Sequence, residues 1–138
     1  TYMYSKAAPL YPFGHGLSYT SFVYSNLKTD SRIVHSGDTL RVTFQLRNSG
    51  ARDGEEVVQL YVSKLNRKAN DPIKQLKAFS RIALKKGDQK EVTLLVAATE
   101  LMHWSEENHS FVLTKGKVVL EVGASSVDIR LKSIVEIQ

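Results

Sequence analysis

The clearest pattern in this sequence is a strict alternation of apolar and polar residues from Leu40 to Arg47. Apolar side chains occupy the even-numbered positions and polar side chains the odd-numbered ones. Because successive side chains of a β-strand point to opposite faces, this pattern predicts a strand with one buried face. Turn-forming residues stand on both sides of it, Gly37-Asp38 before and Asn48-Ser49-Gly50 after.

A second predicted strand, Glu56 to Val62, is apolar on both faces. Val58, Leu60 and Val62 share one face, and Val57, Gln59 and Tyr61 share the other. A strand with two apolar faces is typical of the centre of a sheet, or of a strand whose outer side is covered.

The next strand contains Ile82 and Leu84, and its phase changes after Phe79. The change of phase indicates a β-bulge, and we place Phe79 itself in the core. Gly87-Asp88 predicts a hairpin turn into the strand around Leu94.

The last third of the chain continues the pattern of short strands. Leu101 to Trp104 has the length of one helical turn crossing between sheets. Phe111 to Leu113 and Val118 to Val122 predict a hairpin around Lys115-Gly116, and Val127 to Leu131 closes the fold. Seven or eight short strands without a long helix predict an all-β chain folded as an antiparallel β-sandwich.

The same periodicity predicts the core. We expect Arg41, Thr43, Gln45 and Arg47 to face water. The residues expected to be buried are Leu40, Val42, Phe44, Leu46, Val58, Leu60, Val92, Leu94, Val118, Leu120, Ile129 and Leu131.

The N-terminal segment, Pro9 to Phe22, cannot be a regular element, because Pro12 lacks a backbone donor and Gly14 and Gly16 favour irregular backbone. Seven of the twelve aromatic residues nevertheless fall within the first twenty-four positions. Two interpretations remain open: an arm that caps the core of its own domain, and an arm that docks this domain against a neighbour.

Composition limits the classes of protein to which this chain can belong. At 138 residues, with 42% hydrophobic content, the chain has the size of one soluble globular domain. It has no cysteine and no apolar run long enough to span a membrane. It begins at Thr1 rather than Met and carries no signal peptide, so we expect an excised or processed piece.

The net charge of +5 is concentrated between Lys64 and Lys90, where nine Lys and Arg residues face only two Asp residues. Stacking aromatics, which a nucleic-acid site would need, are missing from this basic segment except for Phe79. We therefore expect a solvated surface and no nucleic-acid partner.

Catalytic and metal-binding patterns are weak. Glu55 and Glu56 are adjacent, so on a strand they diverge, whereas catalysis by a pair of carboxyl groups needs both groups to face one substrate position. Glu106-Glu107 lies in a predicted loop. The four histidines (His15, His35, His103 and His109) lack the spacing of a metal site, and no glycine-rich phosphate loop follows a strand, so we expect no metal and no cofactor.

Four motifs, in order and covering nearly the whole chain, carry a family resemblance. They are PLYPFGHGLSYT at residues 9–20, NSGARDGEEVVQLYV at 48–62, PIKQLKAF at 72–79 and VGASSVDIRL at 122–131. The chain resembles the C-terminal fibronectin type III-like domain of family-three glycoside hydrolases, the β-glucosidases and β-xylosidases. It departs from the family at Ala78, where Gly is usual, and at His15, where Tyr is usual.

The resemblance implies an immunoglobulin-like or fibronectin type III-like β-sandwich at residues 20–138, preceded by an irregular interdomain arm at residues 1–19. It implies that the arm residues Tyr11, Phe13, His15 and Tyr19 dock on the catalytic barrel and α/β domains of the same chain, while Phe22 and Tyr24 point inward. The family's nucleophile is an Asp in a Ser-Asp-Trp-type motif of the barrel. Here the single Trp follows His103, so we expect no catalytic residue.

For the parent protein the resemblance implies hydrolysis of terminal non-reducing β-linked glycosyl residues with retention, on a carbohydrate substrate, in the periplasm or outside the cell. The alternative is a stand-alone carbohydrate-binding module. Such a module would stack sugar rings on exposed aromatics, for which the candidates are Tyr2, Tyr4, Tyr11 and Tyr61.

Overall fold

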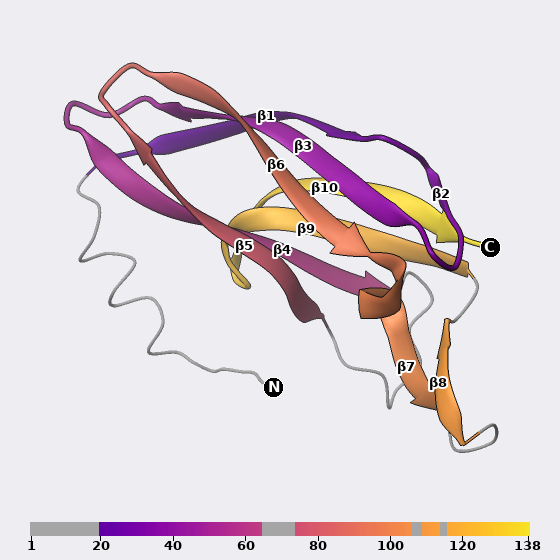
Figure 1. The fold of residues 1–138 in the computed structure, drawn as a ribbon. Helices are drawn as coiled ribbons and strands as arrows, with labels where there is room; N and C mark the ends of the chain where they lie inside the picture. Colours follow the sequence, from indigo (N-terminus) through magenta and orange to yellow (C-terminus); the bar gives the residue numbers. More distant parts are fainter. Residues whose placement is uncertain (1–19, 65–73, 106–108, 114–115) are drawn as a thin grey trace.

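The computed structural model describes residues 20–64, 74–105, 109–113 and 116–138, which form strands joined by short turns (Figure 1). The elements are β1 (Phe22–Thr29), β2 (Ile33–Val34), β3 (Thr39–Asn48), β4 (Gly54–Lys64), β5 (Gln75–Leu84), β6 (Gln89–Ala97), the 3-10 turn η2 (Ala98–Leu101), β7 (Met102–Ser105), β8 (Ser110–Leu113), β9 (Gly116–Ser125) and β10 (Asp128–Ile137).

Two sheets pack face to face as a β-sandwich, which confirms the predicted fold class. The smaller sheet has the strand order β1-β3-β6 and the larger one β2-β10-β9-β4-β5. Neighbouring strands run antiparallel except β2 and β10, which pair in parallel. β7 and β8 form a separate hairpin that projects from one end of the sandwich in Figure 1. β4 lies between β9 and β5, as its two apolar faces predicted.

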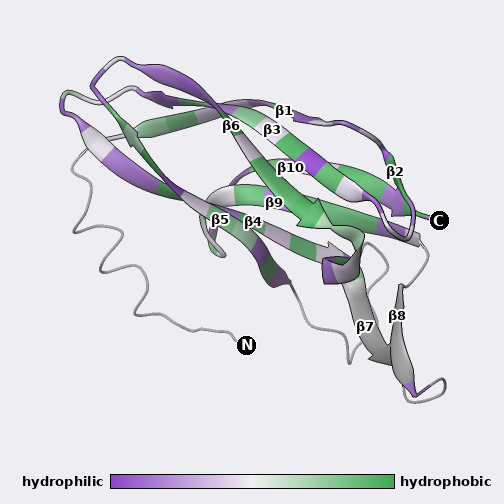
Figure 2. Ribbon diagram, in the orientation of Figure 1, coloured by the Kyte–Doolittle hydropathy of each residue, from purple (hydrophilic) through white to green (hydrophobic). Residues whose placement is uncertain are grey.

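The core lies between the two sheets, and the alternation along β3 supplies its centre (Figure 2). The even-numbered side chains of β3 from Leu40 to Leu46 are buried, and Tyr24 stacks on Phe44 with ring centroids 5.6 Å apart. Ten of the twelve predicted core residues are buried. Ile129 and Leu131 are only half-buried, because they lie at the start of β10, where its register with β9 shifts.

The outward side of β3 is also close to the prediction. Arg41 and Arg47 are exposed, whereas Thr43 and Gln45 in the middle of the strand are half-buried. A middle strand is flanked by neighbours on both sides, here β1 and β6, and their side chains cover part of its central residues.

Two predicted hairpins are wrong. Gly87-Asp88 does form a turn, with Gly87 at φ 81°, but it connects β5 and β6, which belong to different sheets. β8 pairs with β7, while β9 pairs with β10 and β4. Alternation reports which side of a strand is buried and carries no information on which strand becomes its partner. The helical turn is also displaced: η2 ends at Leu101, and Met102 begins β7.

The prediction for Phe79 is wrong as well. The irregularity in β5 lies before Phe79, where Leu60 pairs with Ala78 and Tyr61 pairs with Leu76, so that Lys77 is the extra residue. β5 then continues without interruption to Leu84, and Phe79 lies on the opposite face from Ile82 and Leu84. Phe79 is 67% exposed, whereas Ile82 and Leu84 are buried.

Buried Asn48 holds the turns at one end of the sandwich together. Its side-chain Nδ2 donates to the carbonyls of Arg52 (2.8 Å) and Leu84 (3.1 Å), and its Oδ1 accepts from Thr20 Oγ1 (2.7 Å) and Gly50 N (3.0 Å). Its backbone groups bond to the β5–β6 turn. One fully buried polar residue thereby joins both sheets and satisfies its own hydrogen-bonding groups.

Candidate functional site

The expected docking residues Tyr11, Phe13, His15 and Tyr19, together with the boundary between arm and sandwich at residues 19 and 20, fall at or beyond the edge of the described residues. The part of this prediction that the structure tests concerns the start of β1. Phe22 and Tyr24 both point inward and are buried, as expected.

A polar cluster lies next to them, between the two sheets. The Tyr24 hydroxyl of β1 donates to Glu56 Oε2 of β4 at 3.0 Å. The guanidinium of Arg130 on β10 lies 5.3 Å from the centre of the Tyr24 ring and donates to the carbonyl of Phe22 at 3.0 Å. Arg130 also binds Asp128 through two hydrogen bonds, of 2.6 and 3.0 Å. This Tyr24 cluster connects the smaller sheet to two strands of the larger one.

The electrostatics of the Tyr24 cluster follow from burial and from these contacts. Burial and the neighbouring Glu56 carboxylate raise the pKa of Tyr24. Burial also raises the pKa of Glu56, although the Tyr24 hydrogen bond and the positive charge of Arg130 oppose the shift. The hydrogen bonds from Arg130 lower the pKa of Asp128. Each charged group is directed at another member of the cluster, which is typical of a structural connection between sheets.

The adjacent carboxylates diverge, as predicted. Glu56 faces the sandwich interior, whereas Glu55 lies on the outer side of the larger sheet, 3.4 Å from Arg81 Nη1. Glu55 and Glu56 therefore do not face a common substrate position. Glu106-Glu107 falls outside the described residues.

Tyr61, one of the four sugar-stacking candidates under the alternative interpretation, lacks the exposure that such stacking requires. The ring is only 7% exposed, and its hydroxyl donates to Gln59 Oε1. Lys74 Nζ lies 5.9 Å from the ring centre and 3.1 Å from Glu121 Oε1. Burial raises the pKa of Tyr61, opposed by a hydrogen bond to Ser126. The other three stacking candidates lie within residues 1–19, outside the described part.

The basic segment between Lys64 and Lys90 does not form a single patch where the structure describes it. Arg81, Lys85, Lys86 and Lys90 are exposed, but Lys74 is half-buried in its contact with Glu121. Arg81 is paired with Glu55 on the neighbouring strand.

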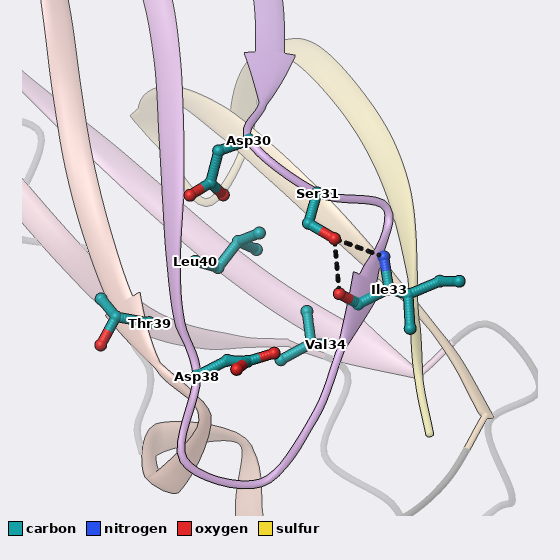
Figure 3. Close-up of a pocket in the computed structure, with 7 residues that line it drawn as sticks. All are labelled: Asp30, Ser31, Ile33, Val34, Asp38, Thr39 and Leu40. Atoms are coloured by element: carbon teal, nitrogen blue, oxygen red, sulfur yellow. Dashed lines mark hydrogen bonds between the residues drawn. The ribbon is translucent and has the colours of Figure 1, made fainter.

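A small pocket of about 180 Å³ lies at the edge of the sandwich, beside β2 and the start of β3 (Figure 3). Its two carboxylates already hold the surrounding backbone: Asp30 Oδ1 accepts from Arg41 N at 3.0 Å, and Asp38 Oδ2 accepts from His35 N at 2.8 Å. Ser31 bonds to both backbone groups of Ile33. The pocket is smaller than ordinary ligand pockets, and its polar groups shape the loop.

Within the described residues, no group of three or more His, Cys, Asp or Glu side chains could hold a metal ion. The same residues include no helix long and apolar enough to cross a membrane.

Sequence reasoning missed the Tyr24 cluster, although two signals for it are present. Glu56 has the same parity as Val58 and Leu60, which predicts that its carboxylate points inward. Asp128 and Arg130 are two residues apart on a strand, so they share one face and can pair.

Comparison with known proteins adds a family. Residues 56–126 match the family described as Fibronectin type III-like domain. The structure resembles that of the β-D-glucoside glucohydrolase from Trichoderma reesei, with a TM-score of 0.80 and 31% identity, and the match covers 91% of this chain and 20% of that chain.

The curated relatives of this chain are also named β-glucosidases and β-xylosidases. The chain is 35% identical to thermostable β-glucosidase B of Acetivibrio thermocellus and covers 17% of it. It is 37% identical to a β-xylosidase of Formosa agariphila, covering 18%, and 32% identical to the periplasmic β-glucosidase of Salmonella typhimurium, covering 16%. These matches include 94%, 96% and 88% of this chain. The chain therefore spans less than one fifth of the length of each of these three curated relatives.

Proposed function

This chain belongs to the fibronectin type III-like domain family, and from that premise we propose that it is a non-catalytic C-terminal accessory domain of a β-glucosidase or β-xylosidase. Its work is to brace the catalytic barrel and α/β domains of the longer polypeptide. Residues 20–138 form the bracing sandwich and residues 1–19 the interdomain arm, in which Tyr11, Phe13, His15 and Tyr19 make the docking contacts.

The main support for this proposal is the difference between the share of this chain and the share of each relative that the alignments cover. Nearly all of this chain aligns with each relative, yet most of each relative lies outside the alignment. In the described residues, the conspicuous carboxylates are either paired with cations or bonded inside the sandwich. Both observations favour chemistry located in other domains of the parent protein.

The parent's reaction in this proposal is hydrolysis of terminal non-reducing β-glycosidic bonds with retention of configuration, in the periplasm or outside the cell. The support is the names of the relatives, which include one periplasmic enzyme. Fold alone does not supply a reaction, so the activity belongs to the parent.

The test compares the longer polypeptide with and without residues 20–138. We expect the truncated protein to lose thermal stability and activity on an aryl β-glucoside or β-xyloside, and the 138-residue chain to hydrolyse neither. Turnover by the purified 138-residue chain that disappears in a single carboxylate variant such as Glu56→Gln would refute the proposal. An unchanged truncated enzyme would refute it too.

A further inference from the structure

The two outer faces of the sandwich differ in chemistry. On the smaller sheet, the outward residues are largely polar and bond to each other across the strands. Gln89 Nε2 donates to Gln45 Oε1 at 3.1 Å, and Gln45 Nε2 lies 3.5 Å from Glu91 Oε2. Arg41, Arg47 and the central threonines complete this polar face, on which two exposed apolar side chains, Leu95 (56%) and Val23 (47%), lie apart from each other, opposite Arg41 and Arg47 respectively.

The outer face of the larger sheet carries apolar side chains from four strands. We call it the Phe79 face; its apolar residues are Val57, Tyr61, Leu76, Phe79, Val119 and Ile134. Strand register places them as neighbours: Phe79 is opposite Gln59, which lies between Val57 and Tyr61, and Leu76 is opposite Tyr61. Val119 is paired with Ile134 on the next two strands.

Several of these side chains are exposed in the 138-residue chain. Phe79 is 67% exposed, Leu76 47% and Ile134 44%. A single exposed apolar residue is ordinary, but a group of them on one sheet face, opposite a polar face on the same domain, marks an interaction surface.

The charged groups around the Phe79 face carry a small excess of positive charge. Lys74 and Lys132 both approach Glu121, at 3.1 and 3.5 Å, and Arg81 pairs with Glu55. Lys117 is paired opposite Glu136, two residues along from Val119 and Ile134 and therefore on the same face. Four cationic groups accompany three carboxylates on this face, and the surface fits a partner that is apolar at its centre and bears Asp or Glu at its edge.

We propose that the Phe79 face is the surface on which this domain docks against another domain of the same polypeptide, one that offers an apolar patch bordered by carboxylates. The inference rests on the proposed function, because the relatives place more than four fifths of their length outside this domain. A protein occupant fits better than a sugar. Phe79 is the one strongly exposed ring in the described part of this face, and the neighbouring Tyr61 ring is buried.

The test uses thiol labelling, for which this cysteine-free chain is well suited. Phe79→Cys and Leu95→Cys form a matched pair, since both replace exposed apolar side chains, on opposite outer faces. Each variant is prepared in the 138-residue chain and in the longer polypeptide, and the rate of maleimide labelling is measured at that position. We expect Phe79→Cys to react at least about ten-fold more slowly in the longer polypeptide, because labelling then requires local undocking, and Leu95→Cys to react equally in both.

Other outcomes would refute the proposal that the Phe79 face is a docking surface. Equal rates for Phe79→Cys in both proteins refute it, as does protection at Leu95→Cys instead. If Phe79→Cys already reacts slowly in the 138-residue chain, residues of that chain cover the Phe79 face and the proposal is refuted. Protection that appears only on adding β-glucan oligosaccharides assigns it to sugar. If the docking face fails while removal of residues 20–138 still weakens the enzyme, the bracing function stands and only its location is wrong.

Discussion

Asn48→Ala is expected to be among the most damaging polar substitutions in the described part of this chain. The side chain is 0% exposed and makes four hydrogen bonds, two as donor and two as acceptor. Alanine removes all four and leaves a small cavity at the end of the sandwich. The affected groups belong to the β3–β4 turn, to the end of β5 and to Thr20.

The magnitude follows from the burial of the partners. The bond to Leu84 O is buried, so its loss leaves an acceptor without compensation, at a cost of about 1–3 kcal/mol. The other three bonds are partly buried, and each loss costs about 0.5–1.5 kcal/mol, since water can replace part of it. Because such contributions are not additive, we expect a total loss of about 3–5 kcal/mol in the free energy of unfolding.

Urea denaturation followed by circular dichroism measures this loss. Ser49→Ala is the neighbouring control: its hydroxyl is exposed and makes one long bond of 3.4 Å to Ser21 O, so we expect a loss below about 0.5 kcal/mol. Asn48→Asp keeps the shape of the side chain but loses the Nδ2 donors and buries a carboxyl group. Because burial disfavours the charged form, the loss of stability relative to wild type should be smaller at pH 4 than at pH 7. A loss below about 1 kcal/mol for Asn48→Ala would refute the reasoning.

Three further predictions concern stability. Phe44→Ala removes a fully buried ring stacked on Tyr24 and should cost roughly 3–5 kcal/mol in urea denaturation; a loss under about 1 kcal/mol would show that β3 is misplaced. Glu56→Gln keeps an acceptor for Tyr24 but removes a carboxylate whose pKa is raised above 4.5 on folding, so wild type should lose stability relative to the variant as pH rises from 4 to 7, and a constant difference would contradict this. Gly123→Ala would place a Cβ 2.1 Å from the backbone oxygen of Asp128. Thermal unfolding should show that the free energy of unfolding falls by about 1–3 kcal/mol, and an unchanged melting temperature would contradict this by showing that the β9–β10 turn accommodates the methyl group without cost.

The sequence predicted those features of the fold that depend on one strand at a time. The alternation from Leu40 to Arg47 identified β3 and its buried side, because a polar residue in the interior would lack hydrogen-bonding partners. The alternation did not predict which strands pair. For example, β5 and β6 are joined by a tight turn, which is typical of a hairpin, but they belong to different sheets.

The errors at individual residues have local causes. Phe79 was placed in the core because a bulge was expected after it, whereas the extra residue is Lys77 before it. Tyr61 is buried by contacts with Lys74 and with the β9–β10 turn, which are far away in sequence. Side-chain environments that depend on such distant segments have no signature in the periodicity of a single strand.

The most direct test of the bracing function is the heat inactivation of the longer polypeptide carrying Phe44→Ala. Phe44 lies in the core of this domain, so the substitution weakens the sandwich without altering any residue outside it. If the domain braces the catalytic domains, the temperature of half-inactivation of glycosidase activity should fall by several degrees. An inactivation temperature equal to that of wild type, while the 138-residue chain is destabilised by the same substitution, would contradict the account.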